Sequence, residues 1–299
     1  MQRLSYIVAY PIIWGISILP FPLLYILSDC IYVLVYHIIG YRKKVVRANM
    51  RRALPHLTKE ELHKTEKKFY HHFCDSFLEM VKTLNMSQKE VAERFVVTNP
   101  EALHQMESEG KSAALLTGHY ANYEWILGMS QHLTTHKGFG IYKPMKNIYF
   151  DRLVRRIRGK LNSELIGVKD VIPTMRKNLR EGKHGFYGFV TDQSPMLGSA
   201  IHWGKFFGQE VPVQVGGEML SKKMGLNIAF SKIEKVKRGY YQCTFLRVEG
   251  DVSKVPNFEV TDNFMHMLEQ QIIKEPAYYL WTHKRFKHCR EAAVNESQC

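Results

Sequence analysis

The sequence has few cysteines, and none of them falls in a pattern that would organise a fold or a metal site. Its five cysteines are an odd number at scattered positions, and no two form Cys-x-x-Cys. This argues against a disulfide framework and favours a reducing compartment. The nearest approach to metal-ligand spacing is His71-His72-Phe73-Cys74, which is more typical of a helix surface. We therefore expect no metal and no other cofactor.

The chain also lacks Gly-x-Ser-x-Gly, the motif that presents the nucleophilic serine of α/β-hydrolases. No internal repeat or low-complexity segment is evident. The 299 residues are enough for one large domain with a substantial core.

Acidic residues are scarce relative to basic ones. There are 42 Lys and Arg against 28 Asp and Glu, which gives a net charge of +14 and a pI near 9.5. Such an excess favours an anionic partner, which can be nucleic acid, anionic lipid or an acidic protein. A nucleic-acid binder would interleave aromatic and basic residues on one strand face or a recognition helix. The basic stretch 149–160 shows no such module, so nucleic-acid binding is a distant alternative.

Charge is nearly absent from residues 1–40. Between Leu4 and Gly40 the only ionisable side chains are Asp29, His37, Cys30 and several tyrosines. Residues 23–39 have about the length that spans a bilayer, roughly 17–25 residues, although Asp29 weakens that interpretation. The region is too long for a cleavable signal peptide, and no Ala-x-Ala site follows it.

A basic cluster follows the apolar region directly, and by the positive-inside rule it should stay in the cytoplasm. Its members are Arg42, Lys43, Lys44, Arg47, Arg51 and Arg52. We therefore predict a membrane-associated helical anchor over residues 1–40, with the bulk of the protein on the cytoplasmic side. The alternative is a buried pair of soluble helices with a basic surface beside it.

Residues 41–290 alternate helical and strand patterns, which predicts one α/β domain with a mostly parallel or mixed central sheet flanked by helices. Residues 291–299 have the composition of a disordered tail. The expected strands include 113–116, 138–142, 165–168, 185–191, 226–232 and 240–248.

His119 follows the apolar run 113–116 and the break at Thr117-Gly118. Asn122 has the character of an N-cap for a helix that contains Glu124 and Trp125. This places His119 on the turn after the carboxyl end of a buried strand, where open α/β sheets bind their ligands. Glu124 is close enough in sequence to fold back on the imidazole, so the pair is a candidate general base and its orienting carboxylate. A structural hydrogen bond is the alternative interpretation.

Further candidates lie near other strand and helix ends. Asp192 and Gln193 follow the strand 185–191, on the same rim as His119, although Asp192 can equally be a turn residue. Gly216-Gly217 begins a helix whose free backbone amides suit an anion or an oxyanion. His283 is a second imidazole, for which packing or phosphate binding is favoured over a role as base.

These motifs occur in an order that resembles a known family. They are His119-x4-Glu124, Thr191-Asp192-Gln193-Ser194-Pro195, Phe206-Phe207-Gly208 leading to Gly216, and the segment 280–287, Leu-Trp-Thr-His-Lys-Arg-Phe-Lys. Together they are similar to the late acyltransferases of lipid A biosynthesis, the lauroyl/myristoyl transferases, over residues 41–287. The Phe-Pro-Glu-Gly-Thr block of the glycerol-phosphate acyltransferases is missing, which counts against an ordinary phospholipid-making enzyme.

The resemblance implies acyl transfer from an acyl carrier protein to a hydroxyl of a phosphorylated, Kdo-bearing glucosamine disaccharide. It implies catalysis by His119 and Glu124, support from Asp192, Gln193 and an arginine that is either Arg156 or Arg158, and work at the cytoplasmic face of a bacterial inner membrane. Acyltransferases that act on a lysophospholipid or an aminolipid stay open, as does a non-enzymatic membrane-surface protein.

Overall fold

The computed structural model describes residues 2–290, so the predicted tail 291–299 lies outside the described residues. At its centre is a seven-stranded sheet in the order β1-β9-β8-β2-β5-β3-β4. All neighbouring pairs are parallel except the antiparallel β8–β9 hairpin. The predicted α/β class with a mostly parallel sheet is therefore confirmed. The strands are β1 (Phe95–Val97), β2 (Ala113–Thr117), β3 (Lys137–Tyr142), β4 (Ser163–Gly167), β5 (Gly185–Val190), β8 (Asn227–Lys237) and β9 (Tyr240–Arg247).

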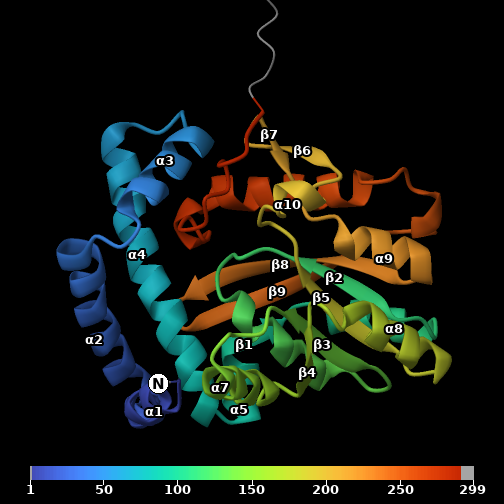
Figure 1. Ribbon diagram of the computed structural model, residues 1–299, viewed down its shortest axis with the longest axis horizontal. Helices are drawn as coiled ribbons and strands as arrows, with labels where there is room; N and C mark the ends of the chain where they lie inside the picture. Colours follow the sequence, from blue (N-terminus) through green and yellow to red (C-terminus); the bar gives the residue numbers. More distant parts are fainter. Residues whose placement is uncertain (1, 291–299) are drawn as a thin grey trace, which may run out of the picture.

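Helices cover the sheet from both sides (Figure 1). In this view α9 and α10 lie above the strands, and α5 and α7 lie below them. β6 (Trp203–Phe206) and β7 (Gln209–Pro212) form a separate antiparallel hairpin. The helices of this part are α5 (Gln88–Arg94), α6 (Pro100–Ser108), α7 (Ile148–Gly159), α8 (Val171–Arg180), α9 (Gly216–Met224) and α10 (Glu259–Lys274). Short 3-10 helices are η2 (Thr83–Asn85), η3 (Tyr123–His132), η4 (Leu197–Ser199), η5 (Val252–Lys254) and η6 (Pro276–Tyr278).

Residues 2–82 form a helical layer at one end of the sheet, drawn in blue to teal in Figure 1. The long helix α4 stands next to the sheet, and α2 packs on its outer side. The helices are α1 (Gln2–Ile18), α2 (Phe21–Tyr32), which continues as the π-helical η1 (Val33–Ile39), α3 (Lys43–Ala53) and α4 (Lys59–Lys82). The capping box at the start of α4 is confirmed, because Thr58 Oγ1 accepts from the Glu61 amide at 3.2 Å and Glu61 accepts from the Thr58 amide at 2.8 Å.

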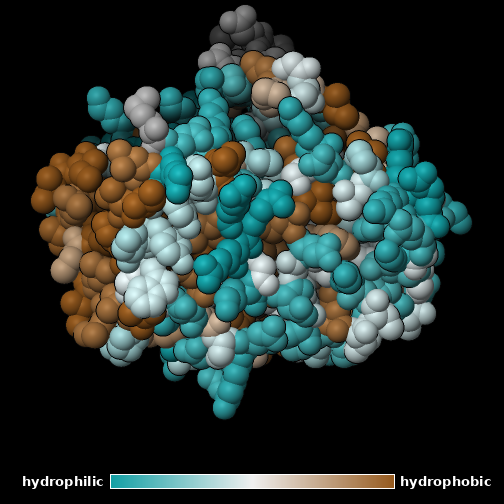
Figure 2. All heavy atoms as spheres, turned by 60° about the horizontal axis from the view of Figure 1, so that its bottom comes forward, coloured by the Kyte–Doolittle hydropathy of each residue, from teal (hydrophilic) through white to brown (hydrophobic). Residues whose placement is uncertain are grey.

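The N-terminal helices are apolar on two sides. Inward, Phe21, Leu24, Tyr32 and Tyr36 belong to the buried core. Outward, α1, α2 and η1 expose large apolar side chains, which form the brown area at the left of Figure 2. They are Leu4, Ile7, Val8, Ile12, Trp14, Ile18, Leu23, Ile26, Val33, Leu34, Ile38 and Ile39. The continuous helix Phe21–Ile39 is long and apolar enough to cross a membrane, by length and composition. This weakly suggests membrane association.

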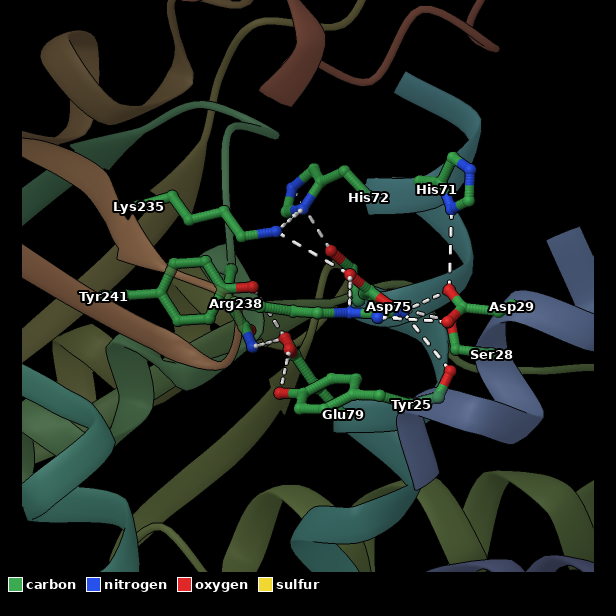
Figure 3. Close-up of polar contacts among 12 residues, drawn as sticks. Tyr25, Ser28, Asp29, His71, His72, Asp75, Glu79, Lys235, Arg238 and Tyr241 are labelled. Carbon is green, nitrogen blue, oxygen red and sulfur yellow. Dashed lines mark hydrogen bonds and ion pairs between the residues drawn. The ribbon is translucent and has the colours of Figure 1, made fainter. Parts of the chain in front are cut away.

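Ionised side chains join α2 to the rest of the protein (Figure 3). Arg238, at the β8–β9 turn, holds both Asp29 of α2 and Asp75 of α4, at 2.6 and 2.7 Å. Tyr25 donates to Glu79 at 2.9 Å. We call Asp75, Glu79, Lys235 and Arg238 the α2 clamp. Asp29, the residue that weakened the membrane interpretation, is therefore paired with a cation of the sheet domain.

Candidate active site

His119 leaves the carboxyl end of β2, as predicted. Every residue of this strand is buried, and it lies between β5 and β8. Gly118 follows directly, and a Cβ at this position would meet Leu268 Cδ2 of α10 at 2.8 Å. The glycine therefore lets the chain pass close under α10 before it turns outward at His119.

The turn after His119 is fixed by its own residues and by the C-terminal segment. Ala121 has a φ of +50°, an uncommon value for a non-glycine residue that is typical of functional turns. Asn122 is confirmed as the N-cap, since its side chain accepts from the Trp125 amide at 3.2 Å, although the helix it caps is the 3-10 helix η3. The Leu280 amide donates to the His119 carbonyl at 3.0 Å. The backbone around the imidazole is thus held from two directions.

Asp192 lies next to His119 because their strands are parallel neighbours. β2 and β5 pair in register to Thr117 and Val190, so both chains leave the sheet at the same edge. His119 Nδ1 and Asp192 Oδ1 are 2.7 Å apart, and the Asp192 side chain is only 1% exposed, while that of His119 is 16% exposed. The predicted common rim is confirmed, and it brings a histidine and a buried carboxylate into direct contact.

The electrostatics of this pair favour an ionised aspartate beside the imidazole. Burial by itself lowers the pKa of His119, but the charge and hydrogen bond of Asp192, with a smaller contribution from Glu124, raise that pKa above its usual value. Burial by itself raises the pKa of Asp192, yet the charge and hydrogen bond of His119 hold the pKa of that carboxyl below its usual range. An imidazole that donates its Nδ1 proton to Asp192 has Nε2 as its basic atom.

Glu124 does not contact the imidazole, which corrects the predicted His119–Glu124 hydrogen bond. It forms a bidentate ion pair with Arg158 of α7, with Nε–Oε2 at 2.8 Å and Nη2–Oε1 at 2.6 Å. The turn at Ala121 and the start of η3 carry Glu124 towards α7, and Asp192 is the carboxylate that contacts the imidazole. Of the two candidate arginines, Arg158 therefore lies at the site. Arg156 donates instead to the Tyr10 hydroxyl of α1 at 3.3 Å.

Two further side chains cover the imidazole. The side-chain amide nitrogen of Gln193 lies 3.2 Å from His119 Nε2 and 3.4 Å from Nδ1. The ring of Tyr123 stands edge-on to the imidazole, with centroids 4.7 Å apart. Gln193 was expected at this rim, whereas no sequence pattern marked Tyr123. Within residues 2–290, no group of three or more His, Cys, Asp or Glu side chains is placed to hold a metal ion.

Comparison with known proteins adds to this geometry. The family model described as bacterial lipid A biosynthesis acyltransferase matches residues 2–288. The chain belongs to this family. It is 24% identical to the lipid A biosynthesis lauroyltransferase of Escherichia coli (strain K12), over 92% of this chain and 89% of that protein. It is 22% identical to the lipid A biosynthesis palmitoleoyltransferase of the same strain and to a lipid A biosynthesis acyltransferase of Shigella flexneri, with the same coverage.

In this acyltransferase the glycines at the start of α9 pack on the sheet close to the site. A Cβ on Gly217 would meet Leu116 Cδ2 at 2.5 Å and Phe189 at 3.2 Å, so close packing requires glycine there. Leu116 and Phe189 belong to the last residues of β2 and β5, the ends that carry His119 and Asp192. A Cβ on Gly216 meets nothing within 4 Å. The two glycines thus stand near the sheet edge that carries His119 and Asp192, and their suggested role in oxyanion binding stays a prediction.

The C-terminal segment of the acyltransferase adds residues that the local patterns did not assign to the site. Arg285 is 1% exposed and donates from Nη1 to Ser194 Oγ at 3.0 Å and to the Pro212 carbonyl at 2.9 Å. The charge of Asp192 acts on Arg285, on Tyr279 and on His283. Burial lowers the pKa of His283. The motif 280–287 pointed to this segment, but not to the side chains that approach Asp192.

Proposed function

We propose that this enzyme transfers an acyl chain from a thioester to a hydroxyl group of a lipid A precursor, with His119 as the general base. The observation that supports this most directly is the 2.7 Å contact between His119 Nδ1 and Asp192 Oδ1, at the ligand-binding edge of a lipid A acyltransferase fold. Asp192 fixes the imidazole tautomer, and Nε2 is left to take a proton. Glu124, first considered for that role, contributes through its pair with Arg158 beside the base.

The reaction balances with these groups alone. The acceptor oxygen attacks the thioester carbonyl carbon while its proton moves to His119 Nε2. The tetrahedral intermediate then collapses, the carbon–sulfur bond breaks, and the imidazolium returns the proton to the departing thiolate. An ester and a free thiol result. No enzyme nucleophile is needed, because a thioester is already activated.

Negative charge on the carbonyl oxygen needs a nearby donor. The amides of Gly216 and Gly217 at the start of α9 and the guanidinium of Arg158 are the groups that we assign to this task. Oxyanion donors in other enzymes contribute about 3–4 kcal/mol to transition-state stabilisation. Gln193, whose amide nitrogen is 3.2 Å from Nε2, helps to position the hydroxyl.

The charge of the chain fits anionic substrates. We propose an acidic acyl carrier protein as donor and a phosphorylated glycolipid as acceptor, and the net charge of +14 favours both. The names of the relatives, a lauroyltransferase and a palmitoleoyltransferase, concern lipid A biosynthesis. We further propose attachment to the cytoplasmic face of a bacterial inner membrane through the exposed apolar side chains of α1, α2 and η1.

Mass spectrometry of lipid A from cells with and without the gene tests the proposed reaction. We expect one acyl chain to be missing without the gene and to return with the wild-type gene but not with His119→Ala. Unchanged lipid A, together with turnover on defined lysophospholipid or aminolipid acceptors, would favour the alternative acceptors. Extraction without detergent tests the attachment, since complete recovery of the native protein in the soluble fraction would contradict it.

A further inference from the structure

A cationic pocket lies between α3 and the C-terminal segment 284–287. Its volume is about 340 Å³, which falls in the range of small-molecule sites, roughly 300–1,000 Å³. Four cations, one amide and the Phe286 ring are among its lining groups. The cations are Lys44, Arg52, Lys284 and Lys287, and the amide is that of Asn49. A hollow of this kind selects for a compact anionic group.

Among the described residues, no carboxylate neutralises the four cations. No ion pair within residues 2–290 involves any of them, whereas Arg47 on the same helix α3 is paired with Glu66 at 2.8 Å. Four like charges around one hollow repel each other and focus a positive potential into it. Phosphate suits such a site, because its three acceptor oxygens match lysine and arginine donors in charge-assisted hydrogen bonds.

The pocket and the catalytic histidine are linked by one short segment. Asn49 Nδ2 donates to the carbonyls of Trp281 and His283, at 2.8 and 2.6 Å. In the same segment the Leu280 amide donates to the His119 carbonyl at 3.0 Å. The segment 280–287 therefore contacts Asn49 of α3 through two backbone carbonyls, and it contacts the His119 turn through the Leu280 amide.

The pocket also lies close to the exposed apolar surface. The helix α3, which provides Lys44 and Arg52, begins four residues after Ile39, and both Ile38 and Ile39 are exposed. Of the basic residues, those of α3 are therefore among the first to follow the exposed apolar helix along the chain. The hollow is shallow and open to solvent, so its shape does not exclude an acidic protein. Its position directly after the exposed Ile38 and Ile39 favours a lipid headgroup.

We propose that this pocket binds a phosphate monoester of the acceptor lipid and so orients the sugar hydroxyl towards His119. The inference rests on the proposed function, in which a lipid acceptor reacts at His119. It assigns recognition of the acceptor to the pocket, while His119, which Asp192 orients, and Arg158, which Glu124 holds, act at the reacting atoms.

The test measures acceptor binding without turnover. The full-length His119→Ala protein in detergent micelles is titrated with phosphorylated acceptor glycolipid and with the same lipid after phosphatase treatment. We expect K44Q/K287Q to weaken binding of the phosphorylated lipid on the order of tenfold or more, since hydrogen bonds to charged groups contribute strongly. K44R/K287R should retain binding because the charges stay. In the active protein, K44Q/K287Q should raise KM for the acceptor and leave kcat and KM for the donor unchanged.

The matched control is K89Q/K169Q, which removes two exposed lysines remote from the pocket in sequence and should change neither affinity. Equal losses for the phosphorylated and dephosphorylated lipids would overturn the proposal. A raised KM of K44Q/K287Q for the donor would also overturn it, because that result would indicate a docking surface for an acidic protein. So would a loss of binding to phosphatidylglycerol vesicles by K44Q/K287Q while its affinity for the acceptor stays normal. A phosphate-dependent affinity without any turnover by the wild type would keep the pocket and reject the proposed reaction.

Discussion

Two groups of ionisable side chains can be compared in this protein: the site around His119 and the α2 clamp. Both contain carboxylates at hydrogen-bonding distance from basic side chains. In both, the pKa values of the members are shifted: those of His119 and Asp192 at the site, and those of Glu79 and Lys235 in the clamp. They differ in how many of their polar atoms are already bonded to other protein groups. In the clamp Glu79 accepts from Tyr25, Asn122 and Tyr241, at 2.8–2.9 Å. At the site the side chain of His119 is 16% exposed, and among residues 2–290 only Gln193 is within hydrogen-bonding distance of its Nε2 atom.

The comparison shows that burial and charge pairing do not by themselves mark a catalytic site. Burial raises the pKa of Glu79 and lowers that of Lys235, as strongly perturbed groups at active sites also show. Every charged group of the clamp nevertheless has protein partners (Figure 3). The clamp joins α2, α4 and the β8–β9 hairpin, and through Asn122 it also supports the turn that carries His119. We infer that its function is structural.

The largest expected effect is the loss of the base. His119→Ala removes the imidazole that pairs with Asp192, so kcat should fall by about 10²–10⁴-fold, the usual contribution of general base catalysis. The measurement is single-turnover transfer from an acyl carrier protein to lipid A precursor. Circular dichroism and the denaturation midpoint serve as controls, because the variant should stay folded. Near-normal turnover by the folded protein would reject the mechanism.

A second experiment separates the two carboxylates near the base. Asp192→Asn keeps the shape but removes the charge that orients the imidazole, and we expect a loss of roughly 10²-fold or more in kcat. Glu124→Gln breaks only the pair with Arg158 and should cost less. The matched assay compares kcat and KM of both variants under the same conditions. A larger loss for Glu124→Gln than for Asp192→Asn would reverse our assignment of the orienting carboxylate.

The sequence predicted the elements of the site better than the contacts within it. An apolar run that ends in Thr117-Gly118 identifies a strand end, and so does the run before Asp192, which is why both residues were placed on one rim. Which strands are neighbours is not encoded locally. The hydrogen bond between His119 and Asp192 depends on the parallel pairing of β2 with β5, two strands separated by β3, β4 and three helical segments.

Contacts between distant parts of the chain also explain why the expected His119–Glu124 contact is absent from residues 2–290 and why the clamp was not predicted. Spacing along a helix says that Glu124 is near His119, but the positive φ of Ala121 redirects the side chain to Arg158 of α7. The clamp joins α2, α4 and the β8–β9 turn, which lie more than 150 residues apart at the extremes. Local sequence patterns do not predict such long-range pairs. In the sequence, Asp29 is only a charged residue within an apolar run.

The clamp is tested by stability rather than by rate. Asp75 is 4% exposed on its side chain and pairs with Arg238 and with Ser28 Oγ at 2.7 Å. Asp75→Ala leaves Lys235, itself only 9% exposed, without its carboxylate partner. Removing one member of a buried ion pair typically costs about 3–5 kcal/mol in free energy of unfolding. Chemical denaturation should show this loss, while kcat of the folded fraction should change little. A large fall in kcat at unchanged stability would mean that the clamp takes part in catalysis.

The smallest expected effect is a shift in the pH profile of kcat/KM. This profile should distinguish the site around His119 from the α2 clamp most sharply. The base must be neutral, so kcat/KM should rise with pH through the pKa of His119, which Asp192 raises against the effect of burial. Asp192→Asn removes that cause and should move the acidic limb of the profile to lower pH. Asp75→Ala, in the clamp, should leave the limb where it is. A limb that moves to higher pH in Asp192→Asn would contradict the assigned electrostatics.

The contribution of His119 to stability should fall as the pH rises, whereas kcat/KM should increase over the same range. Because the pKa of His119 is raised in the folded state, its contribution is complete below the unfolded value of about 6.5 and is lost as the pH rises through the folded pKa. Because the pKa of Asp192 is lowered, its contribution is present above the unfolded value of about 3.9 and is lost as the pH falls through the folded pKa. The pair should therefore stabilise the fold most between these limits, while activity increases towards the basic side. Denaturation midpoints of the wild type and Asp192→Asn across this window test the linkage, and a difference that grows as the pH rises beyond the His119 limb would refute it.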